Sequence, residues 1–212
     1  MKHPKFYTVL YLFVCILFLS NCVVPYESAR MLPKGAVELK GSYSHVSERF
    51  EGESASINDG LGLGFGYGIT DRINLKLRYE RLFISDADEG VNFIAFGPKF
   101  ALVPNRVAMM FPFGVYSYEG ESTWGVFPNL MGTFPAANNK FEGTLGVRTD
   151  IFFEEGADLL IGLNAGFGIS QDLDRWAIRP DFGLVLNPGE DGVILTFGVG
   201  FSYNILPGGG KR

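Results

Sequence analysis

Residues alternate in character from Ala36 to Asn204, and this alternation limits what the chain can fold into more than any other feature. In ten successive stretches, one set of every-second residues is large and apolar, while the other set is glycine, small, polar or charged. A period of two is typical of a β-strand whose two faces meet different surroundings. The expected strands are residues 36–45, 60–69, 73–83, 92–102, 107–115, 124–134, 141–153, 159–169, 176–186 and 193–203.

Four prolines lie inside these stretches, at Pro98, Pro112, Pro128 and Pro180. Proline lacks the N–H group that a sheet ladder needs. We therefore expect bulges or breaks at these points, and the pattern is weakest around Pro128.

The first residues have the composition of an export signal. Lys2 and Lys5 precede an apolar run from Phe6 to Leu19 that only Thr8 interrupts. A run of this length is too short to span a bilayer comfortably and is typical of a cleaved signal peptide. We assign residues 1–21 to this signal.

The end of the apolar run, Leu19-Ser20-Asn21-Cys22, resembles a bacterial lipobox, in which the cysteine is acylated and becomes the mature N-terminus. Asn21 departs from the small residue usual at that position. The resemblance predicts lipidation of Cys22, and the alternative is an ordinary signal peptide cut nearby. Residues 22–34 are then an irregular tether, residues 35–205 the barrel and residues 206–212 a polar tail.

Cysteine count and charge exclude several classes of function. Cys15 lies in the signal, so the mature chain has at most Cys22 and forms no internal disulfide or cysteine-based zinc site. The net charge of −5 argues against nucleic acid as a partner.

The two strand faces predict a membrane barrel instead of a soluble one. The non-apolar face is rich in glycine, serine and alanine, whereas a soluble exterior carries more charge. The apolar face has aromatic residues near strand ends, as at membrane interfaces. We predict an all-β fold, an up-and-down antiparallel transmembrane β-barrel of about ten strands. The alternative is a barrel, soluble or membrane-embedded, that holds a lipid-like ligand.

A barrel of this size has little free interior once side chains fill it. We expect a plugged or very narrow lumen whose charges pair with one another or form a minor path for solutes. The predicted lumen-lining residues are Lys76, Arg78, Glu80, Glu142, Arg148, Asp150, Arg179 and Asp181.

Alternate connections fall on the same rim of such a barrel, and one set is acidic. Its segments are residues 48–58, 85–90, 118–122, 154–158 and 188–192. With an even number of strands both termini lie at the opposite, periplasmic end, so the acidic rim is extracellular. Carboxylates there can bind divalent cations that bridge to anionic lipid, although a solvated loop surface is the simpler interpretation.

One pair of residues has the spacing of a catalytic site. His45 and Ser47 lie on the same face of an extended strand, and with Glu48 they faintly resemble the arrangement in outer-membrane lipid A deacylases. Glu48 and Arg49 replace that family's Asn-Gly, and the pair is on the first strand. We interpret His45 as an interfacial histidine, and expect no catalytic residues, metal site or cofactor; a lipid A-modifying hydrolase is the third alternative.

Segments such as Phe96-Gly97-Pro98-Lys99-Phe100 and Phe197-Gly198-Val199-Gly200-Phe201-Ser202-Tyr203 resemble the small outer-membrane β-barrel proteins of Gram-negative bacteria, including those of Bacteroidota. This resemblance implies a place in the bacterial outer membrane, with outer-membrane lipid and the barrel assembly machinery as partners. It also implies a structural or surface-interaction role.

Overall fold

The computed structural model describes residues 26–50, 53–84, 90–136, 138–154, 156–188 and 192–207, and the side chains of residues 48–58 are not described. The predicted signal peptide, Cys22 and residues 208–212 lie outside these ranges. Within them, no helix is long and apolar enough to cross a membrane.

Twelve strands form in the described part of the chain. They are β1 (Val37–Phe50), β2 (Glu53–Thr70), β3 (Ile73–Ile84), β4 (Gly90–Val103), β5 (Val107–Met110), β6 (Phe113–Tyr118), β7 (Glu121–Val126), β8 (Asn129–Pro135), β9 (Phe141–Phe152), β10 (Leu160–Ile169), β11 (Trp176–Leu186) and β12 (Val193–Ile205).

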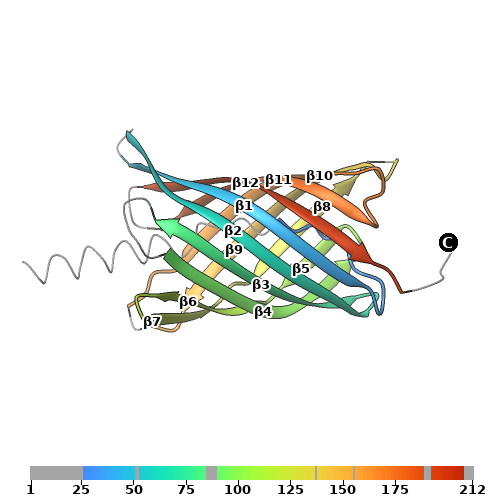
Figure 1. Cartoon of the computed structure of the whole chain (residues 1–212), viewed down its shortest axis with the longest axis horizontal. Helices are drawn as coiled ribbons and strands as arrows, with labels where there is room; N and C mark the ends of the chain where they lie inside the picture. The colour runs from blue at the N-terminus through green and yellow to red at the C-terminus, as the bar shows by residue number, and fades with distance from the viewer. Residues whose placement is uncertain are drawn as a thin grey trace, which may run out of the picture.

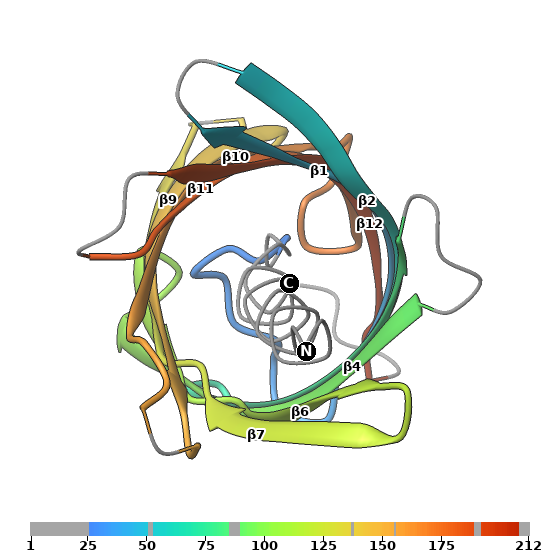
Figure 2. The same cartoon turned by 90° about the vertical axis from the view of Figure 1, so that its left-hand side faces the viewer.

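The strands close into one antiparallel barrel. From β1 to β4 and from β9 to β12 each strand pairs with the next in chain order, and β12 pairs with β1 to complete the ring. β5 and β6 together occupy one strand position of the barrel wall, next to β4. β7 and β8 together occupy the following strand position, next to β9. The barrel wall therefore has ten strand positions. The predicted up-and-down fold is confirmed, and Figures 1 and 2 show the closed ring of strands.

Two of the four prolines break their strands. Pro112 separates β5 from β6 and Pro128 separates β7 from β8, so the predicted continuous strands 107–115 and 124–134 are wrong. Each ring removes a ladder donor, yet the proline carbonyls still accept: Phe127 N donates to Pro112 O at 2.9 Å and Thr149 N to Pro128 O at 3.0 Å. Pro98 and Pro180 stay inside β4 and β11.

The predicted loop over residues 48–58 is also wrong. β1 continues to Phe50 and β2 begins at Glu53, and these two residues pair with each other. β2 has 18 residues, whereas about 9–11 cross a bilayer. The β1–β2 hairpin therefore extends past the length that a bilayer requires, and its end leans outward from the ring of strands (Figure 2).

The apolar side chains face outward. Leu63 is 67% exposed, Phe134 63% and Leu145 58%, with many others near half. The alternate side chains, among them Glu80, Lys99 and Glu142, are almost fully buried inside the barrel. A closed barrel with an apolar outer face and polar residues within is a transmembrane barrel.

The interior has two levels. We call the end with Val37 and Ile205 the terminal end, and the other the hairpin end. Near the hairpin end the lumen holds an apolar cluster, which the sequence analysis did not predict: Val46, Leu82, Val91, Phe93, Ala95, Tyr116, Phe127, Phe152, Leu160, Val185 and Ile194. Toward the terminal end, polar and charged side chains replace it.

Candidate functional site

Residues 26–34, here called the lumenal segment, lie inside the barrel. They are the described part of the predicted tether, and their position in the lumen was not predicted. The chain turns into the lumen at the terminal end, where Gly35 has a φ of 80° and its N–H donates to Gly68 O at 2.7 Å. Figure 2 looks along the barrel and shows the segment, in blue, within the ring of strands.

Side chains of the wall hold the backbone of this segment. Ala29 N donates to Thr133 Oγ1 at 2.7 Å. Asn74, which is fully buried on β3, accepts from Leu32 N at 2.9 Å and donates to Leu32 O at 3.1 Å. Such paired bonds replace the strand partner that an extended segment otherwise lacks.

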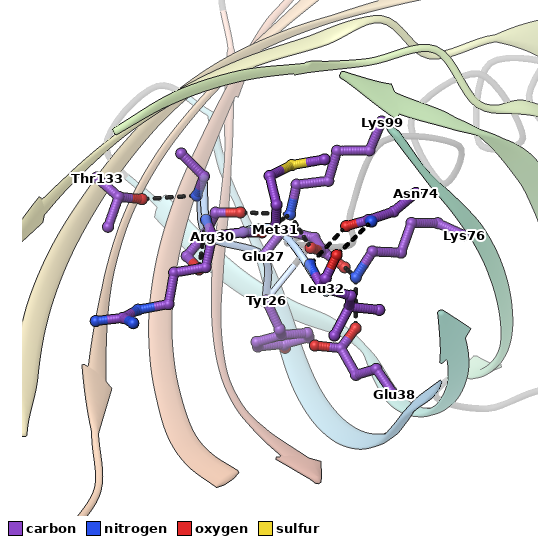
Figure 3. Close-up of polar contacts among 12 residues, drawn as sticks. Tyr26, Glu27, Arg30, Met31, Leu32, Glu38, Asn74, Lys76, Lys99 and Thr133 are labelled. Atoms are coloured by element: carbon purple, nitrogen blue, oxygen red, sulfur yellow. Dashed lines mark hydrogen bonds and ion pairs between the residues drawn. The ribbon is translucent and has the colours of Figure 1, made fainter. Parts of the chain in front are cut away.

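Three lysines from three strands converge on one carboxylate of the segment. Glu27 pairs with Lys40 of β1, with Lys76 of β3 at 3.2 Å and with Lys99 of β4 at 3.0 Å. Lys99 is 1% exposed and also donates to Ser28 O at 2.6 Å and Arg30 O at 2.9 Å. Figure 3 shows Lys76 and Lys99 pointing from the wall toward the segment.

Arg30 makes the corresponding contacts on the other side of the lumen. It pairs with the buried Glu142 of β9, and donates to Asp174 at 3.0 Å and Asn139 at 2.7 Å in the turns of the terminal end. Glu142 also accepts from Arg179 Nη1 at 2.7 Å. The segment is thus fixed by ion pairs of both signs.

Two wall glycines make room for Tyr26. A side chain at Gly198 would place its first carbon 1.8 Å from the Tyr26 hydroxyl oxygen, and one at Gly200 would lie 2.8 Å from Tyr26 Cβ. The Tyr26 hydroxyl donates to Tyr43 O at 2.9 Å. The wall is therefore shaped to this segment, and any larger residue at either glycine collides with it.

All eight predicted lining residues lie on the inner face, most of them buried. The structure brings together Arg78 with Glu80, Arg148 with Asp150 at 2.9 Å, and Arg179 with Glu142. Lys76 pairs with Glu38 and Glu27. Asp181 accepts from Asn164 Nδ2 at 3.4 Å.

Sequence reasoning missed the groups that hold the lumenal segment: Glu27, Arg30, Glu38, Lys40, Asn74, Lys99 and Thr133. The polar phase of the first strand places Glu38 and Lys40 on the inner face, and this signal could have found them. Residues 26–34 have no alternation, so nothing in their sequence indicated a lumenal position.

The charges of the described lumen balance once the partner of Arg30 at the terminal end is included. Seven cationic side chains are buried or half-buried there, namely Arg30, Lys40, Lys76, Arg78, Lys99, Arg148 and Arg179. Six carboxylates face them, namely Glu27, Glu38, Glu80, Glu142, Asp150 and Asp181. Asp174, the exposed second partner of Arg30 at the terminal end, is a seventh carboxylate, so the described cations and carboxylates are equal in number.

An aromatic cap, made of Phe93, Tyr116, Phe127 and Phe152, closes the lumen above the charged level. The Phe93 and Tyr116 rings stack at 4.3 Å between centroids, and Phe127 meets Phe93 edge-on at 5.4 Å. Phe152 contacts Phe127 at 5.9 Å. These packed rings belong to the apolar cluster that fills this level of the lumen.

His45 and Ser47, the pair with the spacing of a catalytic site, lie on the outer face of the barrel. His45 Nδ1 is 2.9 Å from Asp59 Oδ1 on β2, and Tyr43 donates to the same oxygen at 2.8 Å. Asp59 was not predicted as the partner of His45, and the Glu48 side chain is not described. No hydrogen bond joins His45 to Ser47 within the described part of the chain.

The described residues include no group of three His, Cys, Asp or Glu side chains that could hold a metal ion. Much of the predicted acidic rim, including residues 86–89, 155 and 190–191, lies outside the described ranges.

Comparisons with known proteins find similar architecture only. No protein-family model and no curated protein sequence matches the chain. The solved structure of the outer membrane protein OprG from Pseudomonas aeruginosa is 12% identical, with a TM-score of 0.36 over 85% of this chain and 100% of that chain. The attachment invasion locus protein Ail of Yersinia pestis is 12% identical, with a TM-score of 0.37 over 81% and 99%. A de novo designed transmembrane β-barrel is 10% identical, with a TM-score of 0.40 over 82% and 99%. These identities and TM-scores are too low to indicate a role for this protein.

Proposed function

We propose that this protein is a non-conducting β-barrel of the bacterial outer membrane with a structural or surface-interaction role. The observation that carries the proposal is double closure: the lumenal segment fills the terminal half and the aromatic cap fills the hairpin half. The outward apolar face supports insertion into a bilayer. The signal-like residues 1–21 support export.

Planar-bilayer recording tests the closure. The mature wild-type protein is expected to show no stable conductance. Replacing residues 27–32 by a Gly-Ser sequence of equal length empties the terminal half, yet the cap remains, so conductance stays absent. Adding Phe93→Ala, Tyr116→Ala and Phe127→Ala opens the second closure and produces a channel. A large, stable conductance in the wild type contradicts the proposal, and conductance after segment replacement alone favours gated solute passage.

The surface-interaction part rests on the long β1–β2 hairpin. Its strands run well past the length that a bilayer requires, and both chain ends of the barrel lie at the opposite rim. An epitope replacing residues 51–52 is expected to be stained on intact cells. Staining only after permeabilisation would reverse the proposed orientation, and a signal confined to the periplasmic fraction would contradict the membrane location.

Lipidation of Cys22 and cation binding at the acidic rim stay parts of this proposal. Growth with labelled palmitate is expected to label the wild type and not Cys22→Ala. For the rim, Glu119 and Glu121 flank one hairpin turn and Asp158 lies at another. Removal of divalent cations from vesicles of anionic outer-membrane lipid is expected to lower the thermal stability of the barrel.

A further inference from the structure

The outward-facing apolar residues form a belt around the barrel, and among the described residues this belt is shorter on one side. On β1 to β4 it covers seven to nine residues of each strand from the terminal end: Val37–Tyr43, Leu61–Ile69, Ile73–Tyr79 and Ile94–Leu102. On β9 to β12 it covers 11 to 13 residues: Phe141–Phe153, Leu159–Ile169, Trp176–Leu186 and Val193–Ile205. Thr149 is the outward polar residue within this longer part. The belt is therefore wedge-shaped.

A row of polar side chains ends the belt on β1 to β4. The next outward residue toward the hairpin end is polar on each of these four strands: His45, Asp59, Arg81 and Asn92, here called the polar row. His45 Nδ1 lies 2.9 Å from Asp59 Oδ1, and Arg81 donates to Asn92 Oδ1 at 3.2 Å. At the edge of the belt, the hydroxyl of Tyr79 donates to the same Asn92 oxygen at 2.9 Å. The row thus carries charge on the face that meets lipid.

The register of the strands shows how far the two parts of the belt differ in height. On β1 the belt ends at Tyr43, whereas on the neighbouring β12 it continues to Val193, which pairs with Arg49. In a barrel whose strands tilt by about 40°, each residue adds roughly 2.5 Å of height. The belt is then about 20 Å high along β1 to β4 and about 30 Å along β9 to β12. Only the second value matches the hydrocarbon thickness of a bilayer, which is about 30 Å.

Tilting the barrel does not level this belt, because its edge at the terminal end is already even. Val37 of β1 pairs with Ile205 of β12 at that edge. Asp71 and Arg72, which are exposed in the turn between β2 and β3, lie just beyond it. A tilt that lifted the polar row to the height of the opposite edge would draw these two charges into the hydrocarbon. The bilayer has to adapt instead.

From the wedge-shaped belt and the polar row we infer that the barrel thins the bilayer along β1 to β4 and binds the phosphate-bearing headgroups of lipids there. Charged side chains on the lipid face of a barrel cost least near the interface, and lipids beside a short apolar span adapt by local thinning. The headgroups of the leaflet at the hairpin end then meet Arg81, the cation of the row. On the opposite side, acyl chains pack against β9 to β12 over the full thickness.

Spin labels at two matched positions test the thinning. Leu61 on β2 and Thr149 on β9 lie opposite each other in the ring, each eight residues from the terminal edge of the belt. Leu61→Cys or Thr149→Cys is introduced into the mature chain with Cys22→Ala, labelled with a nitroxide and folded into dioleoylphosphatidylcholine vesicles. The depth of each label follows from its EPR accessibility to oxygen and to a water-soluble nickel complex. The label at position 61 is expected to lie about 5–10 Å closer to the headgroups than the label at position 149.

Labels at the terminal edge distinguish thinning from a tilt of the barrel. Ile69→Cys and Phe141→Cys place them on the same two strands, β2 and β9. Thinning confined to the hairpin end leaves these two labels at equal depth, whereas a tilt makes the label on β2 the deeper one.

Removal of the polar row tests its part in the effect. Asp59→Leu with Arg81→Leu leaves the net charge unchanged, lengthens the belt, and is expected to bring the label at position 61 to the depth of the label at position 149. Asp172→Asn with Arg175→Leu, at an exposed ion pair of the terminal end, is the matched control and leaves that depth unchanged. Heat-modifiable gel mobility verifies that each variant is folded. Equal depth at positions 61 and 149 in the otherwise unchanged barrel, unequal depth at positions 69 and 141, or no change on removal of the row overturns the inference.

Discussion

Glu27 offers the sharpest perturbation of the lumenal segment, because it belongs to the segment and not to the wall. Glu27→Gln removes the carboxylate that Lys40, Lys76 and Lys99 share. Glu38 still pairs with Lys40 and Lys76. Removing one partner of a buried ion pair costs about 3–5 kcal/mol. Since each 1.4 kcal/mol is a factor of ten, docking of the segment weakens by about 100-fold to about 4,000-fold.

Hydrogen–deuterium exchange measures this loss directly. The N–H groups of Ala29 and Leu32 donate to Thr133 and Asn74 only while the segment is docked. Their protection is expected to fall by the same factor, while the strand amides of β1 and β12 keep theirs. The variant barrel should still fold, because its wall is unchanged.

Asp174→Asn provides the matched control. Asp174 also pairs with the segment, through Arg30, but it is 66% exposed, and exposed pairs contribute about 0–1 kcal/mol. Protection is therefore expected to change by less than about fivefold. If Glu27→Gln changes the protection of Ala29 and Leu32 no more than Asp174→Asn does, the reasoning that buried ion pairs hold the segment is refuted.

Three further substitutions test other parts of the structure. Gly198→Val collides with Tyr26 and is expected to expose Ala29 N–H to exchange, whereas Gly41→Val, which meets nothing within 4 Å, is not; equal protection in both would contradict the fit of the segment to the wall. Tyr116→Ala empties part of the aromatic cap and is expected to cost about 3–5 kcal/mol in urea unfolding followed by gel mobility; a loss below about 1 kcal/mol would show that the cap is loosely packed. Phe96→Arg, at the centre of β4, is expected to cost about 2–4 kcal/mol and Leu102→Arg, near its end, about 0–1 kcal/mol in lipid vesicles; equal costs would contradict a lipid-facing β4.

Much of the barrel could be predicted because period-two alternation acts locally. Trp176–Leu186 is the strand that the pattern predicted, residue for residue, and β3 and β9 differ from prediction by one residue each. The period-two pattern failed where both faces of a strand are apolar, because the two sets of residues then no longer differ in character. This is the case at Val91 and Phe93, which the structure places inside the barrel near the hairpin end.

The turn between β1 and β2 was mispredicted for a related reason. Residues 48–58 are mostly polar, with Phe50 and Ile57 as the large apolar exceptions, and such a composition is typical of a loop as well as of a strand pair in water. Beyond the membrane both faces of a hairpin meet solvent, so no apolar face marks the strands. The ladder from Val37 to Phe50 continues because each residue pairs with β2 or β12.

Sequence alone determined most of the strands, the outward apolar face and the polar character of most inner residues, because each strand residue meets either lipid or lumen and its type follows from that choice. Tertiary structure decided what fills the lumen. Residues 26–34 have no pattern of their own, and their place depends on Lys40, Lys76 and Lys99, which lie on three different strands. Only closure of the barrel brings these charges within reach of Glu27, and only then do the glycines of β12 form the space that Tyr26 occupies.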